Sequence, residues 1–324
     1  MRGLLMKYVR QKLGSALLTS FFESSAFLSS KLPVSQPERY GVEITRNVPY
    51  THSGLKAHLL DVYRPEHRHG KLPVVLFIHG GGFRILSKET HWLMALNLAR
   101  AGYVVFNINY RLAPKYPFPA AVEDAAAAYC WVAEHAAEYD GDIQKLVVTG
   151  ESAGANLSCA VTLAATYKRT EYFSKNIWDT GIVPQAVMPF CGILEVENWQ
   201  RYIGHPNCPL LLQDRLETVS NEYTRGIEYR GDTLRELANP LLVLEQRPPD
   251  RALPPFFAPV GGADFLEEDC RRLKSALNAH DVFCDAPVYP GEPHAFHAFV
   301  WRKNARKCWE DTFRFLDAVW NDAL

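Results

Sequence analysis

The segment GESAG at residues 150–154 contains a serine whose surroundings suit nucleophilic catalysis. It follows an apolar run at 145–149 and precedes a helix-forming stretch at 153–167. A G-x-S-x-G sequence between a strand and a helix places the serine on a sharp turn, where small neighbours let the strand and the helix approach each other. Such a turn strains the serine backbone and exposes its hydroxyl at the carboxyl edge of a sheet. The sequence therefore predicts Ser152 as a nucleophile.

A second glycine-rich segment, HGGGF at residues 79–83, can supply hydrogen-bond donors. Attack on a carbonyl carbon develops negative charge on the carbonyl oxygen, and bare backbone N–H groups stabilise that charge. We expect the N–H groups of Gly81, Gly82 and Ala153 to form this oxyanion hole. The alternatives are a flexible turn or a phosphate-binding loop, but the Lys-Ser or Lys-Thr pair that a phosphate loop requires is absent.

A nucleophilic serine needs a base, and histidine has an unperturbed pKa of about 6.5 that suits this role. His294 lies in YPGEPHAF at 289–296, directly after the last predicted strand. We prefer it over His297, which we expect to enter the following helical region. His79 belongs to the glycine-rich loop. Four earlier histidines precede the predicted core, and we expect them to be structural or solvated: His52, His58, His67 and His69.

The acidic residue that orients the histidine should follow a strand at the carboxyl edge of the sheet, where Ser152 and His294 are expected. Asp264 follows a predicted strand at 256–260 and is our candidate. Its rivals Glu267, Glu268 and Asp269 are expected in the first turn of a helix, where the helix dipole favours acidic residues. Nucleophile, acid and base then follow one another in the order Ser152, Asp264, His294. This chemistry requires no metal and no organic cofactor.

Strand and helix patterns alternate along the chain. Short, β-branched apolar runs bounded by turn residues predict buried parallel strands at 73–78, 103–108, 145–149, 182–189, 256–260 and 282–289. Helical patterns occur at 90–101, 119–139, 153–167, 266–280 and 303–323. This alternation predicts an α/β fold with a mostly parallel central sheet flanked by helices on both faces.

Two segments fall outside this alternation. Residues 195–240 are rich in tryptophan, tyrosine and charge without a clean period, and residues 1–45 begin with a helical pattern. We expect the two to form a cap over a core built from 46–194 and 241–324. The apolar stripe of the first helix could contact a membrane surface through residues 1–22, but we favour packing against the body of the protein.

The composition indicates which kinds of partner and which cellular compartment are expected for this protein. The formal net charge is −1, which argues against nucleic acid as a partner. Charged residues interrupt every apolar run near the N-terminus, so we expect neither a signal peptide nor a membrane span. Seven scattered cysteines without a CxxC pair favour free thiols in a reducing compartment. A cytoplasmic protein is expected.

The chain resembles the bacterial hormone-sensitive-lipase-like (family IV) esterases. The resemblance is carried by HGGGF at 79–83, YRLAPKYPFPAAVEDA at 110–125 and GESAG at 150–154, and it is supported by GGADFLEED and GEPHAF further on. It covers residues 55–320. It implies an α/β-hydrolase fold with a helical cap, hydrolysis of short- to medium-chain acyl esters as small-molecule substrates, and a possible homodimer.

The chain departs from that family at three places. Glu151 and Lys115 stand where the family usually has Asp and Glu, and residues 84–87 read RILS where a small Gly-Ser pair is frequent. These changes concern the rim of the substrate pocket rather than the predicted triad. A lipase, a deacetylase or an amidase with the same triad remains an alternative. A purely binding protein is disfavoured, because plant gibberellin receptors of similar type lack the histidine that is present here as His294.

Overall fold

The computed structural model describes residues 20, 24, 36–67, 70–229 and 231–324. The helical pattern at the start of the chain, with its possible membrane contact through residues 1–22, lies outside the described residues apart from positions 20 and 24. Among the described helices, none is long and apolar enough to cross a membrane.

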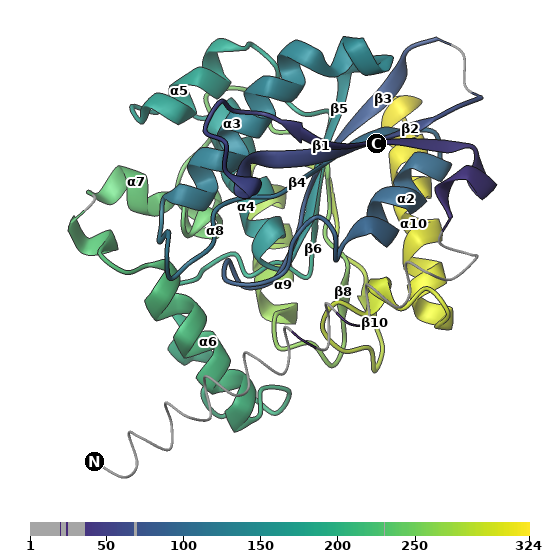
Figure 1. Ribbon diagram of the computed structural model, residues 1–324. Coiled ribbons are helices and arrows are strands. Elements are labelled where there is room, and N and C mark those ends of the chain that lie inside the picture. The colour runs from purple at the N-terminus through teal and green to yellow at the C-terminus, as the bar shows by residue number, and fades with distance from the viewer. Residues whose placement is uncertain (1–19, 21–23, 25–35, 68–69, 230) are drawn as a thin grey trace.

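An eight-stranded mixed sheet forms the centre of the molecule (Figure 1). Its strands, in spatial order, are β1 (Val42–Pro49), β2 (Leu59–Pro65), β4 (Val104–Ile108), β3 (Leu72–Ile78), β5 (Gly141–Glu151), β6 (Ala186–Phe190), β7 (Phe256–Phe257) and β9 (Cys284–Asp285). The pairs β1–β2 and β2–β4 are antiparallel. All remaining neighbours are parallel, which confirms the predicted α/β fold.

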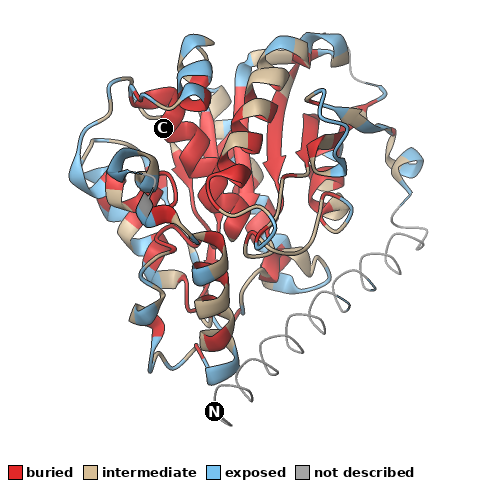
Figure 2. Cartoon of the chain, turned by 60° about the vertical axis from the view of Figure 1, so that its left-hand side comes forward, coloured by how far each residue is buried: buried red, intermediate tan, exposed pale blue. Residues whose placement is uncertain are grey.

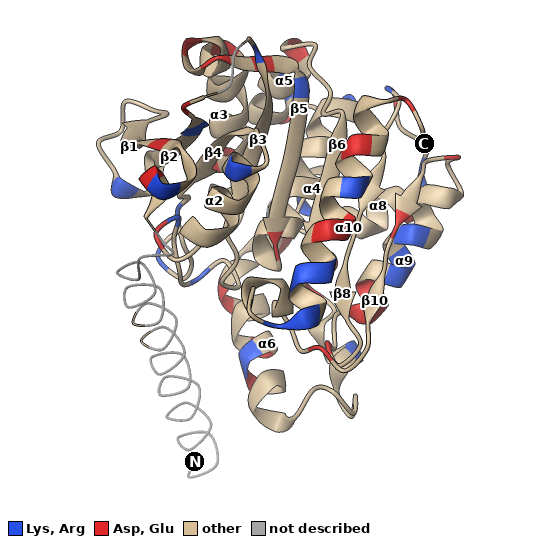
Figure 3. Cartoon of the chain, turned by 90° about the vertical axis from the view of Figure 1, so that its right-hand side faces the viewer, with Lys and Arg blue, Asp and Glu red and all other residues tan. Residues whose placement is uncertain are grey.

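Helices cover both faces of this sheet. They are α2 (Trp92–Arg100), α3 (Ala120–His135), α4 (Ala153–Thr166), α5 (Tyr172–Asp179), α8 (Pro240–Gln246), α9 (Glu267–Asn278) and α10 (Lys303–Trp320). The five helices predicted to alternate with the strands are all present, whereas α5 and α8 were not predicted. Figure 3 shows basic and acidic residues interspersed along α10.

The strand side chains alternate between two hydrophobic cores. Val74, Leu76 and Ile78 of β3 belong to the core that contains residues of α3 and α4. Val75 and Phe77, which lie between them, belong to the core that contains residues of α2 and α10. Successive side chains of a strand point to opposite faces, so a strand that is covered on both faces is apolar throughout. Figure 2 shows these strands and the inner faces of the helices as buried.

Two of the predicted strands are each divided in two. Residues 256–260 form β7 and, after Pro259, β8 (Val260–Gly261). Residues 282–289 likewise form β9 and, after Pro287, β10 (Val288–Tyr289). Proline has no N–H to donate to a strand ladder, which accounts for both interruptions. The short strands β8 and β10 pair with each other in parallel.

The segment 195–240 contains η5 (Trp199–Tyr202), α6 (Leu210–Tyr223), η6 (Ile227–Tyr229) and α7 (Asp232–Glu236). Tyr223, at the end of α6, stacks on Phe83 with ring centroids 3.7 Å apart. Since Phe83 lies a few residues beyond the carboxyl end of β3, this contact places α6 at the carboxyl edge of the sheet (Figure 1).

Candidate active site

Ser152 lies on the turn between β5 and α4, with φ 54° and ψ −110°. This left-handed backbone conformation is strained for a residue with a side chain. The turn is held in place because the Ser152 N–H donates to the Phe190 carbonyl at the end of β6, at 2.9 Å. The strained serine predicted from the sequence is therefore present at the carboxyl edge of the sheet.

Glycine at position 154 lets β5 and α4 approach each other. A Cβ atom added to Gly154 would lie 2.0 Å from the Ile78 carbonyl oxygen, which belongs to the backbone of β3 and cannot rotate away. We expect Gly154→Ala to lower the free energy of unfolding by about 3 kcal/mol, by the overpacking of a dense core. Urea unfolding followed by circular dichroism measures this change. Gly262→Ala is the control, since its added Cβ would meet nothing closer than 3.4 Å; equal losses in both variants would contradict the argument.

The glycine-rich loop after β3 leaves backbone donors available. Gly81 and Gly82 have φ values of 116° and 60°, and a Cβ on Gly81 would lie 2.0 Å from the Ile85 carbonyl oxygen. Within the described part of the chain, no acceptor pairs with the N–H groups of Gly81, Gly82 or Ala153. These are the three donors expected from the sequence. Their conformation suits an acceptor that comes from outside the protein.

Glu151, the residue before Ser152, contacts histidines from two other segments of the chain. The Glu151 carboxylate is 3.0 Å from His297 Nε2 and 3.6 Å from His91 Nε2. His91 Nε2 also accepts a hydrogen bond from the Gly80 N–H at 3.2 Å. Burial would raise the pKa of Glu151, but its two histidine partners hold that pKa well below its usual range. Glu151 thus links the serine turn to the glycine-rich loop and to the loop that bears His297.

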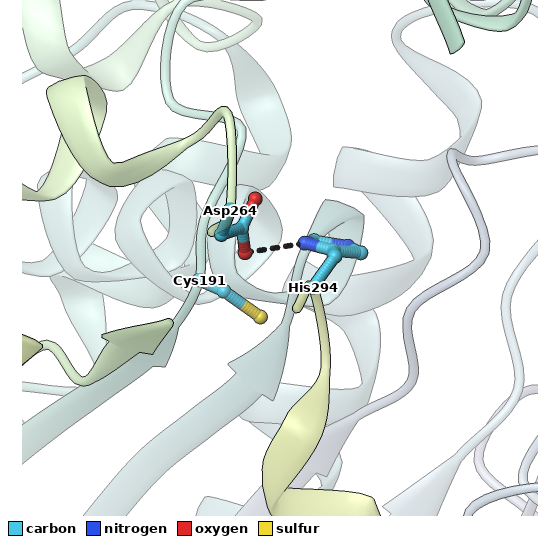
Figure 4. Close-up of side chains that lie close together, drawn as sticks. All are labelled: Cys191, Asp264 and His294. Carbon is cyan, nitrogen blue, oxygen red and sulfur yellow. Dashed lines mark hydrogen bonds and ion pairs between the residues drawn. The ribbon is translucent and has the colours of Figure 1, made fainter. Parts of the chain in front are cut away.

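Asp264 and His294 follow the paired strands β8 and β10. Because these strands are parallel, with Gly261 opposite Tyr289, both residues leave the sheet at the same edge. His294 Nδ1 donates to Asp264 Oδ2 at 2.7 Å (Figure 4). Asp264 is buried, and its other oxygen accepts the Leu266 N–H at 3.0 Å. With the proton on Nδ1, a neutral His294 has its lone pair on Nε2, as a general base requires.

The Asp264 carboxylate also sets the pH at which His294 can act. Burial lowers the pKa of His294, but the adjacent carboxylate more than offsets this and raises the pKa well above its usual value. A base must be unprotonated, so activity should fall as the pH drops through this raised pKa. We expect the acidic limb of kcat/KM, measured on a neutral ester, to lie above pH of about 6.5. A limb at or below that pH would contradict the arrangement.

Cys191, which sequence reasoning missed, lies beside this pair (Figure 4). Ligand atoms of Cys191, Asp264 and His294 all lie within 4.8 Å of one another. The cysteine has φ 39°, its N–H donates to the Pro259 carbonyl at 3.0 Å, and burial raises the pKa of its thiol. Sulfur, nitrogen and oxygen suit a cation such as Zn²⁺, although Asp264 and His294 already share a hydrogen bond. The only sequence signal was its position directly after β6, at the same edge as Ser152.

The other histidines and acidic residues considered as base or orienting acid have different positions or partners. His297 pairs with Glu151, and Asp269 pairs with Arg201 at 2.7 Å. Glu267 and Glu268 lie in the first turn of α9, as expected for acids at a helix N-terminus. Of the earlier histidines, His58 is buried, His52 and His67 are exposed, and His69 lies outside the described residues. Only His294 pairs with an acid that follows a neighbouring strand, among the residues described here.

The sequence of the chain is similar to those of known enzymes. Residues 75–298 match the model of a family described as alpha/beta hydrolase fold. The chain is 28% identical to carboxylesterase NlhH of Mycobacterium tuberculosis over 241 residues, which cover 74% of this chain and 70% of that protein. It is 30% identical to an acetyl esterase of Salmonella schwarzengrund over 226 residues, covering 69% and 65%.

Solved structures agree in fold. Esterase B from Lactobacillus rhamnosis superposes with a TM-score of 0.79 at 19% identity, over 98% of this chain and 96% of that chain. A structure of the same esterase with a tributyrin phosphonate inhibitor gives a TM-score of 0.70 at 19% identity, over 93% and 96%. The chain therefore belongs to the α/β-hydrolase family and, within it, to the hormone-sensitive-lipase-like esterases that its motifs resemble.

Proposed function

We propose that this chain hydrolyses carboxylic esters through an acyl-enzyme formed on Ser152. The observation that carries the proposal is the 2.7 Å hydrogen bond between His294 and Asp264, at the same sheet edge as the strained Ser152 turn. The carboxylesterase and acetyl esterase among its relatives support the ester as the bond cleaved.

In the proposed mechanism, His294 takes the Ser152 proton while the serine oxygen attacks the ester carbonyl carbon. Asp264 keeps the imidazole in the tautomer whose Nε2 accepts that proton. The N–H groups of Gly81, Gly82 and Ala153 bind the oxyanion of the tetrahedral intermediate. His294 then donates the proton to the leaving alcohol. A water molecule, deprotonated by His294, finally cleaves the acyl-enzyme and releases the acid.

We assign short- to medium-chain acyl esters as substrates, in keeping with the acetyl and tributyrin-like groups named for the relatives. A cap formed by residues 1–45 and 195–240 would cover the site, and α6 already contacts the oxyanion loop. The seven free cysteines favour a reducing, cytoplasmic environment. A homodimer is the expected assembly.

A lipase, a deacetylase or an amidase would use the same triad. Rates on 4-nitrophenyl esters of increasing acyl length, compared with rates on long-chain triglyceride and anilide probes, distinguish these activities.

Titration with a fluorophosphonate probe tests the acyl-enzyme. Because the probe reacts with an activated serine and leaves a stable adduct, we expect one label per chain, located on the peptide that contains Ser152. Ser152→Ala serves as the blank for both labelling and 4-nitrophenyl acetate hydrolysis. A wild-type protein that stays unlabelled and inactive would refute the proposal, whereas labelling at another serine would refute the assignment of Ser152.

A further inference from the structure

One face of α6 lies against the oxyanion loop. Arg215, Val219 and Glu222 occupy positions i, i+4 and i+7 of this helix, so they share a face. Val219 lies against Gly82, since a Cβ added to Gly82 would be 2.7 Å from Val219 Cγ2. Glu222 forms an ion pair with Arg84, two residues beyond Gly82. Arg215, one turn before Val219, therefore lies on the face of α6 that packs against this loop, near enough to Arg84 for the two charges to interact.

The guanidinium of Arg215 has no counter-ion within the described part of the chain. Its Nη1 atom is buried and has no hydrogen-bond partner, and no described carboxylate forms an ion pair with it. Burial and the neighbouring Arg84 together lower the pKa of Arg215 to about 10, so it remains protonated at neutral pH. A buried charge without a partner is costly, and a protein that keeps one beside a reaction site can use it to bind an opposite charge.

We propose that Arg215 binds the carboxylate of an anionic ester, so that this hydrolase acts on esters that carry a carboxylate apart from the bond it cleaves. The inference rests on ester hydrolysis at Ser152. The nearby Arg84 is already paired with Glu222, so one positive charge is left for one negative charge. A planar guanidinium, with parallel N–H donors, matches a carboxylate in shape as well as in charge. The carboxylate takes no part in bond making, and Arg215 is a specificity residue.

Two matched pairs of esters test this inference. Mono(4-nitrophenyl) adipate and 4-nitrophenyl hexanoate differ by a carboxylate at the end of the acyl chain. The anion 4-acetoxybenzoate and its methyl ester differ by a charge on the alcohol side. Because a charge-assisted hydrogen bond is strong, we expect the anionic member of one pair to have a kcat/KM about 10- to 100-fold higher than its neutral partner. The pair that shows the preference identifies the side of the ester that faces Arg215.

Arg215→Met keeps an unbranched, apolar stem and removes the charge of the side chain. We expect it to abolish the preference, so that the ratio of anionic to neutral kcat/KM falls about 10- to 100-fold. Arg215→Lys should restore part of the ratio, because it restores the charge without the fork of donors. Arg314→Met, at a side chain that is 71% exposed on α10, is the control with the same change in net charge and should leave the ratio unchanged.

Two results would overturn the inference. One is a wild-type enzyme that hydrolyses both neutral esters faster than their anionic partners. The other is an Arg215→Met variant that loses the same factor on anionic and neutral esters, which would give Arg215 a purely structural role. Failure of the proposed ester hydrolysis looks different, because the neutral esters would then also remain uncleaved and the fluorophosphonate would not label Ser152.

Discussion

Replacing His294 by alanine should lower kcat for a 4-nitrophenyl ester by about 10⁶-fold, as loss of either the nucleophile or its base does in serine hydrolases. Without the imidazole, nothing at the end of β10 can take the Ser152 proton, and the hydroxyl is a weak nucleophile on its own. The variant should still fold, since the His294 side chain is one third exposed and Asp264 is its ion-pair partner. Steady-state rates on 4-nitrophenyl acetate, with circular dichroism as the check on folding, measure this.

His297→Gln is the matched comparison for this experiment. It lies three residues away, and the glutamine amide can still donate to the Glu151 carboxylate that His297 contacts at 3.0 Å. We expect its kcat to stay within about 10-fold of wild type, the range of a residue that supports the site without exchanging a proton. If the two variants lost equal activity, or if His297→Gln lost more, then His294 would not be the base.

Asp264→Asn should lower kcat by about 10⁴-fold, the loss found when the orienting carboxylate of a serine triad becomes an amide. An asparagine amide can present its N–H₂ to His294 Nδ1, which favours the tautomer with its proton on Nε2. That tautomer cannot accept the Ser152 proton. The same change removes the negative charge that raises the pKa of His294, so the acidic limb of kcat/KM should move to lower pH.

Glu268→Gln serves as the control for the acid. It removes a carboxylate four residues further along the same segment, from an exposed position in the first turn of α9. We expect kcat and the acidic limb to be unchanged. An Asp264→Asn variant with nearly full activity would instead mean that another group orients His294. The buried Asp269 is then the least suitable substitute, because Arg201 and Tyr202 already bind it at 2.7 and 2.9 Å.

The sequence by itself determined the local features of this protein. The strand–turn–helix around Ser152 follows from backbone sterics over a few residues, and the GESAG motif carries that information. Apolar periodicity and the alternation of strands with helices determined the α/β fold class. The division of two strands also follows from the sequence, because Pro259 and Pro287 cannot donate a backbone hydrogen bond. The apolar pattern alone predicts each of these strands as continuous.

Tertiary structure decided which distant residues meet. Asp264 and His294 pair because β8 and β10 are parallel neighbours in register, and neither short strand reveals its partner in the sequence. Cys191 comes to lie beside them because β6 ends at the same edge. Arg215 lies on the face of α6 turned to the glycine-rich loop because Val219, on the same face, packs on Gly82. Such contacts depend on sheet order and packing over the whole chain, whereas periodicity and turn chemistry act only between neighbours.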